Sequence, residues 1–69
     1  MKSVRTLIEL WPSAEVFSDD LGLKYRSHGR VMKMRNRIPH TYWTAVIEAA
    51  RRRKIDGVTL DGLARLHSK

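Results

Sequence analysis

The sequence predicts an all-α fold, a compact bundle of about five short helices in one domain that covers residues 1–69. Apolar residues recur along the chain at the spacing of amphipathic helices, and no segment has the pattern of a strand. The chain has 69 residues, of which 42% are hydrophobic, and it contains no internal repeat and no linker rich in proline, glycine or serine. This length and composition suffice for one small core, so we expect neither a second domain nor a disordered chain.

The first predicted helix covers roughly residues 3–10 and the second about 13–21. Pro12 separates them, because proline ends a helix. Ser13 is placed to accept hydrogen bonds from the first free amides of the second helix, and Gly22 suits the left-handed backbone that terminates one. The apolar stripes are Val4, Leu7, Ile8 and Trp11 in the first helix, and Ala14, Phe17 and Leu21 in the second.

The third predicted helix lies in the basic segment 24–37 and is centred on Val31 and Met34, which are three residues apart. Ser27 and His28 are its candidate N-caps. Because the two apolar residues should face the core, the opposite side of the helix should be cationic. That projection places Arg26, Gly29, Lys33 and Asn36 outward, with Arg30 and Met32 on the flanks.

Gly29 weakens such a helix by about 1 kcal/mol relative to alanine, so its presence needs a reason. On the outward side it would let the helix backbone come close to another surface. In the alternative prediction the helix begins only after Gly29, and residues 24–29 form a loop.

The fourth predicted helix covers about 39–53 and opens at Pro39, because proline is tolerated at the first helical position. Asp56 and Gly57 signal a turn, and Thr59 is placed to cap the last helix. The apolar stripes are Trp43, Val46, Ile47 and Ala50 in the fourth helix, and Leu60, Leu63, Ala64 and Leu66 in the last. Trp11 and Trp43 fall on these stripes, which favours a place in the core over stacking on a ligand.

The charge of the chain is strongly positive, with 14 Lys and Arg against 7 Asp and Glu and a net charge of +7. Segment 24–37 holds six cations and no acid, so a phosphate backbone would relieve the repulsion between them. A second basic run, 51–54, lies at the negative end of the fourth helix. It therefore has a structural explanation, the helix dipole, as well as a binding one.

Residues typical of catalysis or metal binding do not cluster in this sequence. It has no cysteine, and its three histidines are far apart. Asp19 and Asp20 are adjacent, so they point to different sides of a helix and do not form a catalytic pair. No apolar run approaches the ~20 residues of a membrane span. We expect no enzyme, no cofactor, no metal and no small-molecule ligand, and we expect a cytoplasmic protein.

A helix that ends at Gly22, a short turn and a cationic helix have the order of a helix-turn-helix, whose second helix enters the major groove of DNA. The run Val31–Trp43, which contains R-x-x-I-P-x-x-Y-W, together with Ala49-Ala50, Ile55–Leu60 and Leu63-Ala64, resembles small Cro-like regulators of phages and prophages in the lambda-repressor-like superfamily. The resemblance covers about residues 13–67. It differs at Met34, where many relatives carry tryptophan, and in a slightly long turn, 22–29.

This resemblance implies an all-α repressor that binds double-stranded operator DNA as a homodimer. Some members of similar size are anti-CRISPR-associated regulators that repress their own operon. A domain of this size reads few base pairs, so two copies on a palindromic operator are expected.

The contact residues follow from their positions in the basic segment. The predicted base contacts are Arg26, Ser27, His28, Arg30 and Lys33. The predicted DNA-backbone contacts are Lys24, Tyr25, Arg35, Asn36, Arg37 and His40. Leu60, Leu63 and Leu66 are the predicted dimer interface, and the alternative is that they complete the core of the monomer. Two other functions stay open: a basic surface that binds an acidic host protein, and RNA binding, which the shortage of exposed aromatic residues disfavours.

Overall fold

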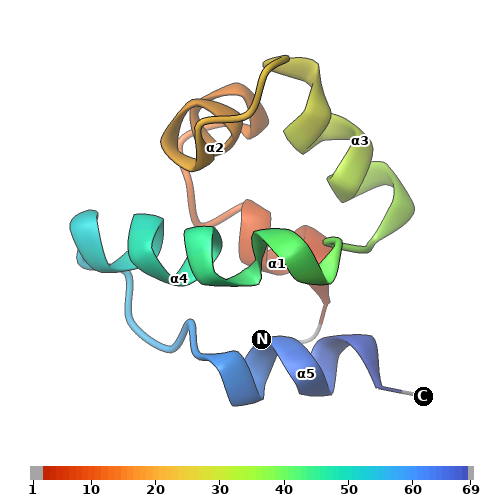
Figure 1. Ribbon diagram of the computed structural model, residues 1–69, viewed down its shortest axis with the longest axis vertical. Helices are drawn as coiled ribbons and strands as arrows, with labels where there is room; N and C mark the ends of the chain where they lie inside the picture. The colour runs from red at the N-terminus through yellow and green to blue at the C-terminus, as the bar shows by residue number, and fades with distance from the viewer. Residues whose placement is uncertain (1–2, 69) are drawn as a thin grey trace.

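The computed structural model describes residues 3–68, and its regular structure within that range is entirely helical (Figure 1). The elements are α1 (Val4–Ile8), α2 (Ala14–Leu21), α3 (Ser27–Arg35), the 3-10 turn η1 (His40–Tyr42), α4 (Trp43–Arg52) and α5 (Leu60–His67). The predicted all-α fold is confirmed. Along the long axis of the molecule, α2 and α3 lie at one end, α5 at the other, and α4 crosses between them.

Three predicted helix caps are present. The hydroxyl oxygens of Ser13 and Thr59 accept hydrogen bonds from the backbone N–H of Val16, at 3.1 Å, and of Gly62, at 2.9 Å. Gly22 ends α2 in the left-handed conformation, with φ of 72°. These short-range signals therefore placed the ends of the helices well, because each cap satisfies backbone groups that the helix leaves free.

The start of the fourth helix differs from the prediction. Pro39 has an extended ψ of 140°, and the chain next forms η1, in which Tyr42 N–H donates to Pro39 O at 2.9 Å. The α-helix begins only at Trp43. The reason lies just before it, where the indole Nε1 of Trp43 donates to the carbonyl of Ile38 at 2.9 Å and draws the chain back across the start of the helix.

The core takes residues from all five helices and from the segments that join them. Trp11 packs edge-on against Phe17, with ring centroids 4.9 Å apart, and its indole Nε1 donates to Asp20. The buried apolar residues are Val4, Leu7, Ile8, Trp11, Phe17, Met32, Ile38, Val46, Ala49, Ala50, Val58 and Leu63. Trp43 packs against this cluster while remaining partly exposed, so both tryptophans lie where the apolar stripes predicted.

The predicted orientation of α3 is wrong. Met32 is 2% exposed and Gly29 is buried, whereas Val31 is 39% and Met34 is 73% exposed. The helix is thus rotated so that the residues predicted inward face outward. It begins at Ser27, so the alternative start after Gly29 is also wrong. Its N-cap is Arg26 instead of Ser27 or His28, and no side chain forms a capping hydrogen bond.

The last helix places its leucines differently from one another. Leu63 is 1% exposed, and Leu66 packs against the core, whereas Leu60 is 57% exposed. Two of the three predicted dimer residues therefore complete the core of this chain. None of the helices within residues 3–68 has the length and apolar character that crossing a bilayer requires.

Candidate nucleic-acid interface

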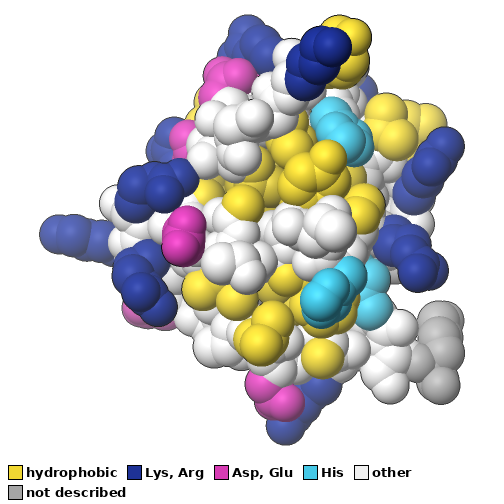
Figure 2. Space-filling view, in the orientation of Figure 1, with side chains coloured by type: hydrophobic (Ala, Val, Ile, Leu, Met, Phe, Trp, Pro, Cys, Tyr) yellow, Lys and Arg dark blue, Asp and Glu magenta, His cyan; other side chains and the backbone are white. Residues whose placement is uncertain are grey.

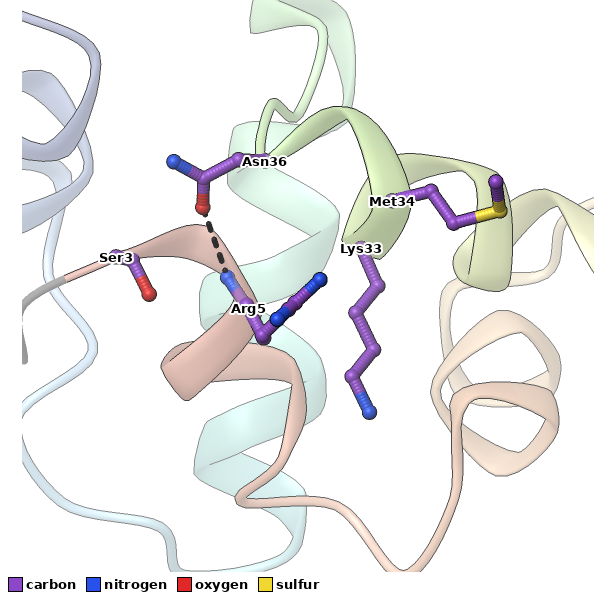
Figure 3. A pocket seen from close by; sticks show the side chains of 5 residues that line it. All are labelled: Ser3, Arg5, Lys33, Met34 and Asn36. Carbon is purple, nitrogen blue, oxygen red and sulfur yellow. Dashed lines mark hydrogen bonds between the residues drawn. The ribbon is translucent and has the colours of Figure 1, made fainter.

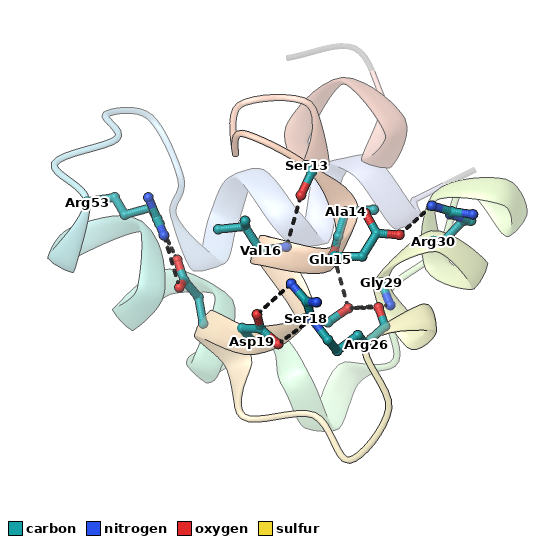
Figure 4. Close-up of polar contacts among 11 residues, drawn as sticks. Ser13, Ala14, Glu15, Val16, Ser18, Asp19, Arg26, Gly29, Arg30 and Arg53 are labelled. Carbon is teal, nitrogen blue, oxygen red and sulfur yellow. Dashed lines mark hydrogen bonds and ion pairs between the residues drawn. The ribbon is translucent and has the colours of Figure 1, made fainter.

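The contact between α2 and α3 sets the orientation of the basic segment, and it depends on Ser18 and Gly29 (Figure 4). Ser18 is fully buried, and its hydroxyl accepts a hydrogen bond from Gly29 N–H at 2.7 Å. The same hydroxyl lies within donating distance of the carbonyl oxygens of Arg26, at 2.7 Å, and Ala14, at 3.1 Å. A β-carbon at position 29 would lie 2.4 Å from the Ser18 oxygen and 2.6 Å from Ala14 O.

Gly29 is therefore the residue that permits this close packing. The sequence indicated a close backbone approach at Gly29, but the approaching surface is α2 and lies inside the fold. Because one side of α3 is pressed against α2 at Gly29, the opposite side of the helix is turned to solvent.

The side of α3 that faces solvent carries Ser27, Arg30, Val31 and Met34. These four residues are spaced i, i+3, i+4 and i+7, so they form one continuous strip along the helix. We call them the outward strip. Two of its members are predicted base contacts: Arg30, which has a long cationic side chain, and Ser27, which has a hydroxyl group. The other two, Val31 and Met34, are apolar, and the sequence prediction placed them in the core.

Two predicted base contacts are held by carboxylates of α2 (Figure 4). Arg26 forms a two-pronged pair with Asp19, from Nε to Oδ1 and from Nη2 to Oδ2, each at 3.1 Å. Arg30 pairs with Glu15. The hydrogen bond from the backbone N–H of Glu15 itself is the main cause that lowers the pKa of its carboxyl, and Arg30 adds to it.

Exposed ion pairs of this kind contribute only about 0–1 kcal/mol. The guanidinium groups of Arg26 and Arg30 are both largely exposed. They can therefore exchange their carboxylate partners for another anion or a hydrogen-bond acceptor at little cost.

Lys33 and Asn36 face α1 instead of the outward strip (Figure 3). Lys33 Nζ lies 3.4 Å from Glu9 Oε2, and the side-chain oxygen of Asn36 accepts a hydrogen bond from Arg5 N–H at 3.1 Å. Ser3 caps the same end of α1 through Thr6 N–H. Asn36 also ends α3 with a φ of 53°. Both residues thus join α3 to α1 around a hollow of about 280 Å³.

His28 is only partly exposed, and its ring packs edge-on against Tyr42 with centroids 5.5 Å apart. It lines a shallow hollow of about 200 Å³ together with Arg35, Arg37 and Pro39. This hollow lies beside the outward strip, since Val31 belongs to both.

The predicted backbone contacts occupy both ends of α3. Lys24 and Tyr25 are exposed in the connection before the helix, with Lys24 Nζ 5.5 Å from the Tyr25 ring centroid. Arg35 and Arg37 are exposed at its end. Within residues 3–68, Lys24, Arg35 and Arg37 form no salt bridge, which distinguishes them from Arg26, Arg30 and Lys33.

His40 belongs to an aromatic stack that fixes the segment after α3. Its ring centroid lies 4.7 Å from that of Trp43, whose other neighbour is His67 at 5.0 Å. Ile38 N–H donates to His67 Nε2 at 2.9 Å, and Ile38 O accepts from Trp43 Nε1. The opposite ring nitrogen of His67 lies 2.8 Å from Leu63 O. The I-P-x-x-Y-W element thus has a clear structural role, and His67 is a partner that sequence reasoning missed.

The second basic run is anchored to Asp20 at the end of α2. Arg53 pairs with the Asp20 carboxylate, and Arg52 Nη2 donates to the backbone carbonyl oxygen of Asp20 at 2.8 Å. Within residues 3–68, Arg51 and Lys54 form no salt bridge. Hydrogen bonds from Arg53 first, and then from Trp11, lower the pKa of Asp20. In return, the bond to Asp20 raises the pKa of Arg53. Part of this run therefore stabilises the fold through contacts with Asp20, and not only through the helix dipole.

The positive charge is consequently divided between separate regions of the surface. Figure 2 shows one face, on which most Lys and Arg side chains lie around the rim, with apolar groups, histidines and uncharged groups between them. No group of three His, Asp or Glu that could hold a metal ion occurs within residues 3–68. The surface features that remain are the outward strip and the cations at the ends of α3.

Comparison of the chain with models of known protein families, with curated proteins and with solved structures finds no match.

Proposed function

We propose that the chain is a sequence-specific regulator that binds double-stranded DNA, with α2 and α3 as its helix-turn-helix. The observation that carries the proposal is the outward strip of α3, which is exposed along its length and flanked at both ends by cations without a carboxylate partner in residues 3–68. The resemblance of its sequence to Cro-like regulators agrees with this function and favours a repressor acting in the cytoplasm.

The dimensions of α3 suit the major groove. Its 9 residues span about 13 Å, and an α-helix with its side chains is about 10–12 Å across. The major groove of B-DNA is about 12 Å wide. With α3 in the groove, Ser27 and Arg30 meet base edges, and arginine bound to guanine O6 and N7 is the commonest specific contact.

The cations at the ends of α3 suit the phosphate backbone. Lys24 precedes the helix, and Arg35 and Arg37 end it, so they lie where the two walls of the groove would approach the protein. Phosphate contacts fix the position of a protein on DNA, and base contacts give it sequence preference. Arg26 is the N-cap of α3 and His28 lies in its first turn, and we assign both to the same border of the groove.

We further propose that the chain binds as a homodimer on a two-fold operator, because a single helix reads only a few base pairs. Because Leu63 is buried and Leu66 packs against the core, Leu60 is the exposed leucine of α5 for such a contact. Size-exclusion chromatography with light scattering, with and without the operator, tests the dimer.

Selection of bound sequences from a random duplex pool tests the proposed function. We expect one enriched motif with two-fold symmetry. Arg30→Ala should then abolish the preference for that motif over random DNA, whereas Arg37→Ala, the matched control, should weaken binding to both. An unenriched pool, or equal effects of the two variants, would contradict the proposal. Capture of a tightly bound acidic protein, without a DNA shift even at roughly 50 mM salt, would favour the protein-binding alternative.

A further inference from the structure

Two large apolar side chains lie exposed in the middle of the most cationic segment of the chain. Val31 is 39% and Met34 is 73% exposed, and Met34 is the most exposed large hydrophobic residue within residues 3–68. In Figure 3 the Met34 side chain extends away from Asn36, while Lys33 points along α1. Neither Val31 nor Met34 belongs to the apolar cluster of the core. These two side chains therefore do not contribute to the core of the fold.

We propose that Val31 and Met34 contact the C5-methyl groups of thymines and so give the protein part of its sequence preference. This inference rests on the proposed function, since it places the outward strip in the major groove. The thymine methyl is the apolar group that base pairs present in that groove, where it is contacted by apolar side chains.

The charge around the pair favours DNA over an apolar protein surface as its partner. Lys24, Arg35 and Arg37, which have no carboxylate partner within residues 3–68, lie at the two ends of the strip, so a partner that covers Val31 and Met34 must also accept cations at both ends. A DNA groove has this combination, because phosphates border a floor on which thymine methyl groups are exposed.

The spacing of the strip limits which bases are involved. Val31 and Met34 are three residues apart, which is about 4.5 Å along a helix axis. Successive bases are about 3.4 Å apart along a DNA strand, so the two side chains reach neighbouring base pairs or base pairs separated by one other. Arg30 directly precedes Val31. A guanine bound by Arg30 should therefore lie beside the first thymine.

Replacement of single thymines by deoxyuridine tests this inference, because it removes the methyl group and keeps every hydrogen-bonding atom. The probe is the duplex that the selection enriches, and the measurement is Kd by fluorescence anisotropy at constant salt. For the wild-type chain, we expect about a fourfold rise in Kd at one or two positions of each half-site, since burial of one methyl-sized group contributes roughly 0.8 kcal/mol.

Alanine variants identify which side chain contacts the methyl group at each thymine position. Val31→Ala and Met34→Ala should each abolish the deoxyuridine effect at one position and retain it at the other. Leu10→Ala, which truncates an exposed leucine that lies outside α3 and outside the proposed dimer contact, should retain both effects. All three side chains are exposed, so the variants should keep the wild-type unfolding temperature, which circular dichroism measures.

The outcomes separate the two proposals. If the wild-type chain enriches no duplex, the proposed function fails and the thymine contacts fail with it. If a duplex is enriched but deoxyuridine changes Kd at no position, or changes it equally in Val31→Ala, Met34→Ala and wild type, the thymine assignment is overturned while the proposed function stands.

Discussion

Replacement of Gly29 by alanine should destabilise the protein, although alanine is the better helix former. Taken alone, helix propensity predicts that Gly29→Ala stabilises α3 by about 1 kcal/mol. The structure predicts the opposite sign. The added β-carbon would lie 2.4 Å from Ser18 Oγ, 2.6 Å from Ala14 O and 3.1 Å from Phe17 Cδ2. Two of these distances are below the 3.0 Å that β-carbon contacts in proteins essentially never cross, and one of the two involves a backbone oxygen, so α3 must move away from α2.

The size of the loss follows from what that movement breaks. Overpacking in a tight interior costs about 1–3 kcal/mol. The buried hydrogen bond from Gly29 N–H to Ser18 contributes roughly another 1 kcal/mol. After subtraction of the propensity gain, we expect a net loss of about 1–3 kcal/mol in the free energy of unfolding. In a domain of this size each kcal/mol lowers the unfolding temperature by roughly 4–8 °C.

Urea and thermal unfolding, followed by circular dichroism at 222 nm, measure this loss. Gly62→Ala is the matched control, because Gly62 is also helical but its added β-carbon approaches only the Thr59 hydroxyl, at 3.1 Å, and Gly57 O, at 3.8 Å. We expect that variant to be neutral or slightly stabilised. The double variant Ser18→Ala/Gly29→Ala should lose less stability than the sum of the single variants, because one clash disappears. A Gly29→Ala protein as stable as wild type would refute the close α2–α3 packing and the orientation derived from it.

Three further predictions concern ionisation, the aromatic stack and the arginine of the outward strip. The pKa of Asp20 lies below its ordinary value of 3.8, so its ionised form stabilises the fold above that pH, and this stabilisation is lost as pH falls through the lowered value. The Asp20→Asn variant should therefore be less stable than wild type at pH 7 and should lose less stability on acidification. Urea midpoints measured from pH 7 to 2 will test this. Trp43→Phe keeps an aromatic ring but removes the donor to Ile38 O, which should cost about 1–2 kcal/mol, and an unchanged urea midpoint would contradict that role. Glu15→Gln removes the carboxylate that pairs with Arg30 and should tighten duplex binding about two- to fivefold; weaker binding to the enriched site would mean that Glu15 instead holds Arg30 in position.

Helix ends were predictable because their signals are local. Ser13, Gly22 and Thr59 each act on backbone groups within a few residues, so the sequence around them contains the whole interaction. The apolar stripes of α1, α2 and α4 were equally clear, since several residues repeat at helical spacing. By contrast, the hydrogen bond from Ile38 N–H to His67 Nε2 joins residues 29 positions apart, which no short-range signal connects.

The orientation of α3 was not predictable by the same reasoning, because hydrophobicity was the wrong guide there. Two exposed apolar residues, Val31 and Met34, outweighed a single buried one, Met32, in the helical projection. The decisive residue was Gly29, which has no side chain and so contributes nothing to an apolar stripe. A buried serine on the facing helix was the second signal, and only the combination of Ser18 with Gly29 identifies the contact.

In the folded chain, the acidic side chains of the first two helices neutralise part of the positive charge of α3. Residues 1–23 carry a net charge of −2 and residues 24–37 a net charge of +6, which predicted a helix with one apolar and one continuous cationic side. In the structure the acidic segment lies against the basic one, through the pairs Glu9–Lys33, Glu15–Arg30 and Asp19–Arg26. The sides of α3 are thus partly neutralised, while its two ends keep their charge. A continuous cationic side would bind any phosphate backbone, whereas this arrangement confines the unpaired charge to the borders of the strip. Under the proposed function, Ser27, Arg30, Val31 and Met34 would then distinguish one DNA sequence from another.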